Sequence, residues 1–236
     1  MPATMRSTIV YDIEVAGFAW DEVDEITRGY LLEREHDTQA RETVPERTAL
    51  VPGLGKIVAI GMWLVGEDRG LLLQEGPDQD ERTMEKVPGA KIFRGSERRI
   101  LEKFWQTVTH KAQGQPSRLV TYNGRSYDGP MLMIRSAQLG LPAERDLVGY
   151  RYDIADHCDL QDVLTFMGST YPRYSLDFWC RRFEIESPKG KIDGSQIARA
   201  YRQGRIDDIG EYCLRDVRAT AELYSKLADT ILPLLG

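Results

Sequence analysis

Two carboxylates lie close together near the start of the sequence, in the stretch YDIEV at residues 11–15. On a β-strand, successive side chains point to opposite faces, so Asp12 and Glu14 project from the same face. Two like charges on one face repel each other, and burying either one is costly unless a partner compensates it. A bound cation is such a partner. The alternative, equally compatible with this stretch alone, is a strand end whose acidic face lies in water.

A second candidate site follows a short β-prone run, in the stretch TYNGRSYDGPML at residues 121–132. Asn123 and Gly124 break the run, and Asp128 then takes the N-cap position of a helix expected at 130–139. A capping role alone would account for Asp128. Its sequence neighbours do not decide between a cap and a chemical role.

The third candidate lies in EYCLRDVRATAELY, residues 211–224, which has helical spacing. Tyr212 and Asp216 are four residues apart, so they lie one above the other on one face of the helix. The commonest form of such a pair is a half-buried tyrosine beside a solvated aspartate. The inward stripe of this helix is expected to contain Ile209, Cys213, Val217, Thr220, Tyr224 and Leu227.

Taken together, the three stretches resemble the three motifs of the DEDD, or DnaQ-like, 3′–5′ exonucleases, and the tyrosine at position 212 is typical of the tyrosine subtype. The segments YDIE, YNGRSYD and YCLRDV are similar to a group related to the proofreading exonuclease domain of family B DNA polymerases. The resemblance implies an α/β fold of the ribonuclease H-like type, with a mixed five-stranded sheet flanked by helices. No polymerase palm or fingers would fit in the remaining residues, so we expect a stand-alone nuclease.

The resemblance also implies an activity. We expect a two-metal-ion 3′–5′ exonuclease that hydrolyses the phosphodiester bonds of single-stranded nucleic acid, DNA in the first place, to nucleoside 5′-monophosphates. The partner of this enzyme is the 3′ end of a strand, and its cofactors are two Mg²⁺ or Mn²⁺ ions. Protein partners are left open.

The same resemblance assigns roles to the candidate residues. Asp12 would bridge both ions, Glu14 and Asp216 would bind one of them, and Asp128 would reach the other through water. Tyr212 would orient the attacking water. Asn123 and Tyr127 are expected at the substrate, with support of the loop as a second role for Asn123.

Charge supports the expectation of metal. The four negative charges of the carboxylates are balanced by two dications. Without metal, two like charges about 4 Å apart repel each other by about 4 kcal/mol at an effective dielectric constant near 20. Oxygen ligands suit Mg²⁺ or Mn²⁺ better than Zn²⁺. We therefore expect Asp128 both to cap its helix and to reach the metal site.

Two other functions fit parts of the pattern. One is a nucleic-acid- or protein-binding module of the same fold that does not hydrolyse, although a degenerate binder would be expected to lack at least one of the acids. The other is a phosphatase with an aspartyl nucleophile on the first strand. That scheme gives the helix with Tyr212 and Asp216 no role.

Composition describes a globular chain of 236 residues, 42% hydrophobic and 29% charged. No apolar run reaches the roughly 20 residues that a membrane span needs, and the N-terminus lacks the layout of a signal peptide. Three cysteines without a C-x-x-C pair argue against a disulfide framework and a structural zinc site, so we expect a cytoplasmic protein. We expect one exonuclease domain over residues 1–236.

The net charge of −6 is uneven along the chain. Residues 21–47 hold nine acids and four arginines, a net charge of −5, which leaves −1 for the rest. This stretch lies in an acidic insertion at about 16–55, between the first two expected strands. The overall sign therefore does not exclude a nucleic-acid partner.

Hydrophobic periodicity predicts an α/β mixture with a mixed sheet. The expected strands are at 7–15, 56–65, 70–74 and 119–122, with GYRYDIA at 149–155 as the candidate for the fifth. Besides 130–139, the expected helices are at 97–109, 159–167, 175–183, 193–203 and 207–233. The first of these should bury Ile100, Leu101, Phe104, Trp105 and Val108, and a helix in the insertion should carry Trp20, Val23, Ile26, Tyr30 and Leu31 on one side.

Further polar and aromatic residues lie outside this core set. His157 is expected to be structural, and Asp159 is left outside the catalytic group. The stretch 171–191 interleaves basic residues with aromatic ones, as a single-strand groove would, although a helix with buried aromatics explains most of them. The basic candidates are Arg173, Arg181, Lys189 and Lys191, and the aromatic residues are Tyr171, Tyr174, Phe178, Trp179 and Phe183.

Overall fold

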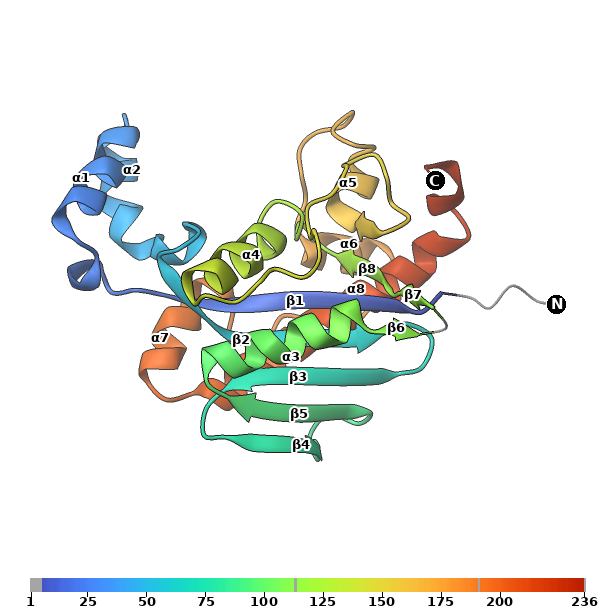
Figure 1. Ribbon diagram of the computed structural model, residues 1–236. Coiled ribbons are helices and arrows are strands. Elements are labelled where there is room, and N and C mark those ends of the chain that lie inside the picture. The colour runs from blue at the N-terminus through green and yellow to red at the C-terminus, as the bar shows by residue number, and fades with distance from the viewer. Residues whose placement is uncertain (1–5, 113, 191, 236) are drawn as a thin grey trace.

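The structure is a computed structural model, and it describes residues 6–112, 114–190 and 192–235. Its centre is a mixed seven-stranded sheet in the order β4-β5-β3-β2-β1-β8-β9 (Figure 1). The strands are β1 (Thr8–Gly17), β2 (Gly55–Leu64), β3 (Arg69–Glu75), β4 (Gln79–Thr83), β5 (Ala90–Gly95), β8 (Arg118–Thr121) and β9 (His157–Asp159). A separate ribbon pairs β6 (Lys111–Ala112) with β7 (Gln115–Pro116).

The expected number of five strands is wrong. Two strands, β4 and β5, follow β3, and the segment 149–155 forms no strand. Tyr150 and Tyr152 in that segment are exposed, so its alternation does not correspond to a buried face. The edge position next to β8 is taken instead by β9, whose three buried residues are too few to produce a readable pattern.

Strand β1 lies inside the sheet, between β2 and β8. It pairs antiparallel with β2 from Ile9 to Gly17, with a register shift between Glu14 and Val15, and Asp12 lies opposite Gly61. The parallel pairing with β8 covers only Thr8 to Val10. The half of β1 that carries the two acids therefore lies beyond the end of that pairing.

Helices cover both faces of the sheet. Helices α3 (Glu97–Thr109) and α4 (Asp128–Gln138) pack on one face, and the long helix α8 (Ile206–Ala228) runs behind the other (Figure 1). The five residues expected to point inward from α3 are all buried, which confirms that prediction. One core joins α3 and α4 to alternate residues of β1, and a second core lies between the sheet and α8.

The remaining helices are short: α5 (Leu160–Leu164), α6 (Leu176–Arg182), α7 (Ile197–Arg202), and the 3-10 turns η4 (Gly194–Gln196) and η5 (Leu232–Leu234). The helices α5, α6 and α7 and the turn η4 each lie within a segment that was expected to be helical, and each is shorter than that segment, whereas η5 extends one residue past the expected helix 207–233. In the described part of the chain, no helix is both long and apolar enough to cross a bilayer.

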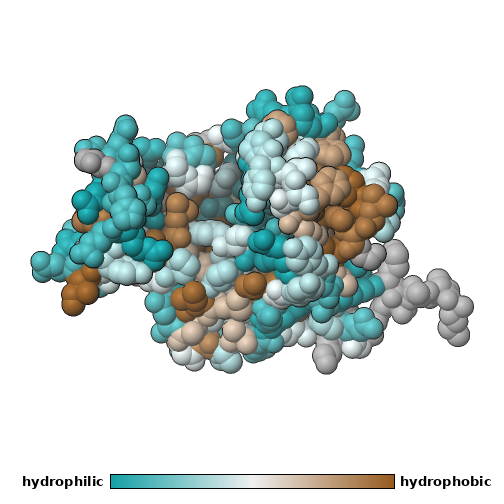
Figure 2. All heavy atoms as spheres, turned by 90° about the horizontal axis from the view of Figure 1, so that it is seen from above, coloured by the Kyte–Doolittle hydropathy of each residue, from teal (hydrophilic) through white to brown (hydrophobic). Residues whose placement is uncertain are grey.

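The insertion between β1 and β2 contains α1 (Glu25–Arg34), α2 (Thr38–Thr43) and the 3-10 turns η1 (Trp20–Glu22), η2 (Val44–Glu46) and η3 (Thr48–Leu50). The predicted apolar side of its helix is only partly correct. Val23 is buried but precedes α1, whereas Ile26 is 85% exposed and Tyr30 is 57% exposed. Seen from above, the insertion forms a mainly hydrophilic lobe at the left, and the surface is hollowed beside it (Figure 2).

Candidate active site

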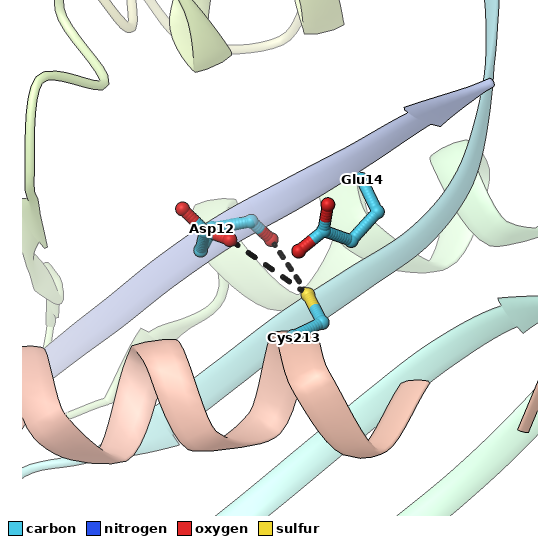
Figure 3. A group of neighbouring side chains, drawn as sticks. All are labelled: Asp12, Glu14 and Cys213. Atoms are coloured by element: carbon cyan, nitrogen blue, oxygen red, sulfur yellow. Dashed lines mark hydrogen bonds between the residues drawn. The ribbon is translucent and has the colours of Figure 1, made fainter. Parts of the chain in front are cut away.

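The two acids of β1 point toward α8, where they meet Cys213 (Figure 3). One ligand atom from each of Asp12, Glu14 and Cys213 lies within 4.8 Å of the other two. Glu14 is 6% exposed, and no hydrogen bond to its carboxylate is found within the described residues. The prediction that both acids share one face of the strand is confirmed, and helix α8 covers that face in part, because Glu14 is buried whereas Asp12 is half-buried.

Helix α8 can approach β1 and β2 closely because the strand position opposite Asp12 is a glycine. A Cβ added at Gly61 would lie 3.0 Å from both the carbonyl oxygen and the Sγ of Cys213. Contacts this short would push the helix away from the sheet. Gly61 thus sets the spacing at which the α8 side chains reach the acids of β1.

Asp128 does not cap α4, so the capping role that the sequence predicted is wrong. The helix begins at Asp128, and its N-cap residue is Tyr127. The Oδ1 atom of Asp128 instead accepts the backbone N–H of Ile13 at 3.0 Å. The physical reason is that Ile13 lies beyond the pairing of β1 with β8, so its N–H needs another acceptor.

Tyr212 and Asp216 lie on α8, half-buried, beside the acids of β1. Burial raises the pKa of Asp216 to about 6, against a hydrogen bond with the Tyr212 side chain and the nearby Arg215 charge, which both lower it. Burial raises the pKa of Tyr212 well above its ordinary value, and the charges of Asp216, Glu14 and Asp12 add to that rise. The pair therefore belongs to the same electrostatic group as the β1 acids.

Neighbouring carboxylates raise the pKa values of the two acids of β1 and of Asp128. Burial is the largest cause for Asp12, followed by the charges of Asp128, Glu14 and Asp216. The pKa of Glu14 is raised by burial and then by Asp216 and Asp128. For Asp128, burial raises the pKa to about 7 although its bond to the Ile13 N–H lowers it. Asp128 and Asp216 are not part of the compact group around Cys213, but their charges raise the pKa values of its two acids.

This electrostatic arrangement fits divalent cations. Among the described residues, no positively charged side chain is one of the groups that shift the pKa of Asp12, Glu14 or Asp128. Buried carboxylates without a cationic partner are unfavourable unless they are protonated or bind a metal. Carboxylate oxygens are the ligands that Mg²⁺ and Mn²⁺ prefer. The residues present therefore suit the ions that the sequence led us to expect.

The two residues expected at the substrate lie in the connection between β8 and α4. The hydroxyl of Tyr127 donates to the carbonyl oxygen of Ala49, 2.8 Å away, so it links this connection to the insertion. Asn123 has a left-handed backbone with φ of 65°, and its N–H donates to Asp159. This contact is made by the backbone, so both roles expected of the Asn123 side chain stay predictions.

Asp159 has a larger role than the sequence indicated. Its buried carboxylate accepts three backbone N–H groups, from Asn123, Arg125 and Gln161, each at 2.9 Å. It thus holds the connection that leads to Asp128, and it also caps α5. The helix-start pattern at 159–162 is the one signal in the sequence that could have found it.

His157 is buried, in agreement with the structural role expected for it. Its Nε2 lies 2.9 Å from the hydroxyl of Thr121, and burial lowers its pKa to about 3. A neutral imidazole in this position stabilises the pairing of β8 with β9.

The stretch 171–191 packs only some of its aromatic residues against the core, and these include Trp179 and Phe183. Tyr174 stacks on Phe178 with ring centroids 4.0 Å apart, while Tyr171 is 73% exposed. Arg181 and Lys189 both pair with Asp177, and Arg173 is exposed. The candidate Lys191 lies outside the described residues.

Comparison with known proteins gives the family. A family model described as a "predicted 3′–5′ exonuclease related to the exonuclease domain of PolB" matches residues 54–230. The matched span contains Asp128, Tyr212 and Asp216. It begins after the two acids of β1, which the fold brings near the other three residues.

Among curated proteins, the chain is 28% identical over 142 residues to a DNA polymerase of Pyrococcus glycovorans, covering 54% of this chain and 18% of that protein. It is 25% identical over 188 residues to the catalytic polypeptide of DNA polymerase epsilon from Aspergillus fumigatus, covering 73% and 8%. The chain thus spans less than a fifth of the length of either relative.

Among solved structures, the family B DNA polymerase of Pyrobaculum calidifontis shares the fold with a TM-score of 0.60 at 18% identity. The similarity covers 95% of this chain and 25% of that one. Since the family model matches about three quarters of the sequence, the chain belongs to the family of predicted 3′–5′ exonucleases related to the exonuclease domain of PolB.

Proposed function

We propose that the protein is a metal-dependent 3′–5′ exonuclease that shortens single-stranded nucleic acid, DNA in the first place, and releases nucleoside 5′-monophosphates. The observation that carries the proposal is the meeting of four carboxylates from three distant segments of the chain. They are Asp12, Glu14, Asp128 and Asp216, and the charge of Asp216 raises the pKa values of the other three.

The four acids would hold two Mg²⁺ or Mn²⁺ ions, with Asp12 between them. When bound, such ions stabilise the charge on the attacking and leaving oxygens of an in-line displacement. Asp128 keeps one oxygen on the Ile13 N–H, and its second oxygen would be the one available to an ion.

Tyr212 would position the attacking water. Its pKa is raised above the ordinary value, so the phenol stays protonated at neutral pH and is a poor general base. A protonated hydroxyl beside Asp216 can still donate a hydrogen bond and orient a water molecule. Asn123 and Tyr127 would shape the substrate path through the connection that contains them.

The proposal extends to the fold and the cellular setting. We propose a ribonuclease H-like arrangement in a single domain, in which the β1–β2 insertion is an addition to the sheet. The three cysteines are free and buried, which is compatible with a reducing compartment such as the cytoplasm.

The test is hydrolysis of a DNA and an RNA oligonucleotide, each labelled at its 5′ end, with Mg²⁺, with Mn²⁺ and with excess EDTA. We expect progressive shortening from the 3′ end with either metal, none in EDTA, and none with a 3′-terminal phosphorothioate block. The matched control is Asp12→Asn, which removes one ligand at nearly constant volume. Binding of the strand without shortening under all conditions would favour the non-hydrolytic module instead.

A further inference from the structure

Cys213 places a sulfur atom inside the acidic site. Its Sγ lies 3.5 Å from the carbonyl oxygen of Asp12 and 4.0 Å from the Oδ2 atom of the same residue (Figure 3). The side chain is fully buried between α8 and β1. The other cysteines, Cys158 and Cys180, are buried as well, but neither belongs to such a group of possible ligands within the described residues.

Glu14 gives a second, independent indication of a ligand at this point. The residue is 6% exposed, and its carboxylate points toward the sulfur and Asp12 without a hydrogen-bond partner among the described residues (Figure 3). Burying a carboxylate that lacks both a donor and a cation is costly, and a bound cation would offset that cost. The three candidate ligand atoms already lie within 4.8 Å of one another.

The chemistry of this set differs from that of a site made only of carboxylates. Zn²⁺ takes sulfur at about 2.3 Å and carboxylate oxygen at about 2.0–2.2 Å, and sulfur ligands select it over Mg²⁺. The sulfur and oxygen ligands of one Zn²⁺ ion lie closer together than the 4.8 Å limit that contains the three ligand atoms here. Small rotations of the Asp12 and Glu14 side chains would bring these atoms within bonding distance of one ion.

We propose that Asp12, Glu14 and Cys213 form a binding site for a thiophilic divalent cation of the Zn²⁺ class, separate in selectivity from the ions that support hydrolysis. On binding, a metal–sulfur bond replaces the S–H bond, and the thiol proton passes to solvent. The inference shares two carboxylates with the proposed function. An ion held in this way would occupy those carboxylates and inhibit hydrolysis.

The experiment uses Cd²⁺ as the probe, because a Cd²⁺–thiolate bond has an ultraviolet charge-transfer band and Zn²⁺ is silent. The metal-free full chain is titrated with Cd²⁺ as wild type, Cys213→Ser and the matched control Cys180→Ser. We expect one charge-transfer band at one equivalent for wild type and the control, and none for Cys213→Ser. Loss of a ligand should weaken Cd²⁺ binding by at least the roughly tenfold effect of losing an outer-shell partner.

Two further measurements separate the possible outcomes. Mn²⁺ affinity should be nearly equal in wild type and Cys213→Ser, which also shows that the variant keeps its carboxylate site. Cadmium NMR of the wild type reports sulfur ligation directly and needs no variant. A wild-type spectrum without sulfur ligation, or a charge-transfer band that persists in Cys213→Ser, would overturn the inference. Because these readouts measure binding, a protein without nuclease activity could still bind Cd²⁺, and an active nuclease could fail to bind it.

Discussion

The carboxylate of Asp128 accepts the backbone N–H of Ile13 at 3.0 Å, across 115 positions of sequence. This bond holds the first residue of α4 against the strand that carries Asp12 and Glu14. A hydrogen bond from a backbone amide to a charged acceptor stabilises by about 1.5–3 kcal/mol. One oxygen of Asp128 is thus occupied by the fold, so the orientation of the other is fixed before any metal binds.

The metal-free protein should lose stability as the pH rises. Burial raises the pKa of Asp128 to about 7 and that of Asp216 to about 6, so the folded state binds protons that the unfolded state has already lost. Stability in EDTA should therefore fall as the pH rises from about 4 to about 7, and Asp128 alone contributes on the order of a few kcal/mol.

Thermal melting in EDTA across this range measures the effect. Asp128→Asn should weaken the pH dependence, because the amide oxygen can still accept the Ile13 N–H while the charge is gone. The exposed control Asp229→Asn should behave as wild type. A melting temperature that rises with pH would contradict the assignment of mutually repelling acids.

Asp12→Asn and Asp216→Asn should each abolish hydrolysis and leave the fold intact. Each change removes a proposed ligand and one source of repulsion, so the melting temperature without metal should be equal or higher. Melting curves in EDTA beside single-turnover cleavage in Mn²⁺ measure both effects, with Glu222→Gln on the exposed side of α8 as control. Markedly lower melting temperatures for both variants would show that the two carboxylates are structural.

Tyr212→Phe should lower the turnover rate by roughly 10- to 1000-fold, the scale of a lost positioning group. Mn²⁺ affinity should stay nearly unchanged, because the phenol is not a proposed ligand. The matched control is Tyr224→Phe on the same helix, whose hydroxyl accepts from Arg118 at 2.9 Å, away from the acids. Single-turnover rates and Mn²⁺ titrations of the three proteins measure the two effects. If Tyr212→Phe cleaved at the wild-type rate, Tyr212 would have no positioning role.

Asp159→Ala should destabilise the protein and weaken metal binding. It leaves three backbone N–H groups without their acceptor, and each unsatisfied buried donor costs about 1–3 kcal/mol. The connection that ends at Asp128 then loses its anchor. Asp153→Ala is the control, since that carboxylate accepts a single N–H in an exposed turn. Denaturant unfolding and Mn²⁺ titration measure the two effects, and unchanged Mn²⁺ affinity at reduced stability would confine Asp159 to a structural role.

The acidic insertion should affect substrate affinity more than chemistry. Residues 24–43, with six acids and three arginines, can be replaced by a short Gly/Ser linker. The remainder should stay, because Ala49 accepts the Tyr127 hydroxyl and Thr48 donates to Phe18. Removing net negative charge near the strand should raise affinity, most strongly at low salt. Equal affinity and equal salt dependence would place the insertion away from the substrate path.

Helical spacing and the strand period of two correctly predicted features that depend on residues close together in the chain. Helix α3 begins and ends where its spacing indicated, and the period of two placed Asp12 and Glu14 on one face. Long-range partners were not readable: Asp128 looked like a cap because the N–H of Ile13 is distant in sequence. Periodicity likewise put Cys213 on the inward stripe of α8 but could not show that Asp12 lies opposite.

The position of β1 inside the sheet has a consequence for biosynthesis. The strand is translated before two of its main partners, because its neighbour β8 and its covering helix α8 follow it by about 100 and 200 residues. Contacts so distant in sequence form slowly and late. A nascent chain therefore carries Asp12 and Glu14 as isolated acids, and the cluster assembles only when α8 docks. Translation itself thus delays assembly of the acidic cluster until α8 has been made.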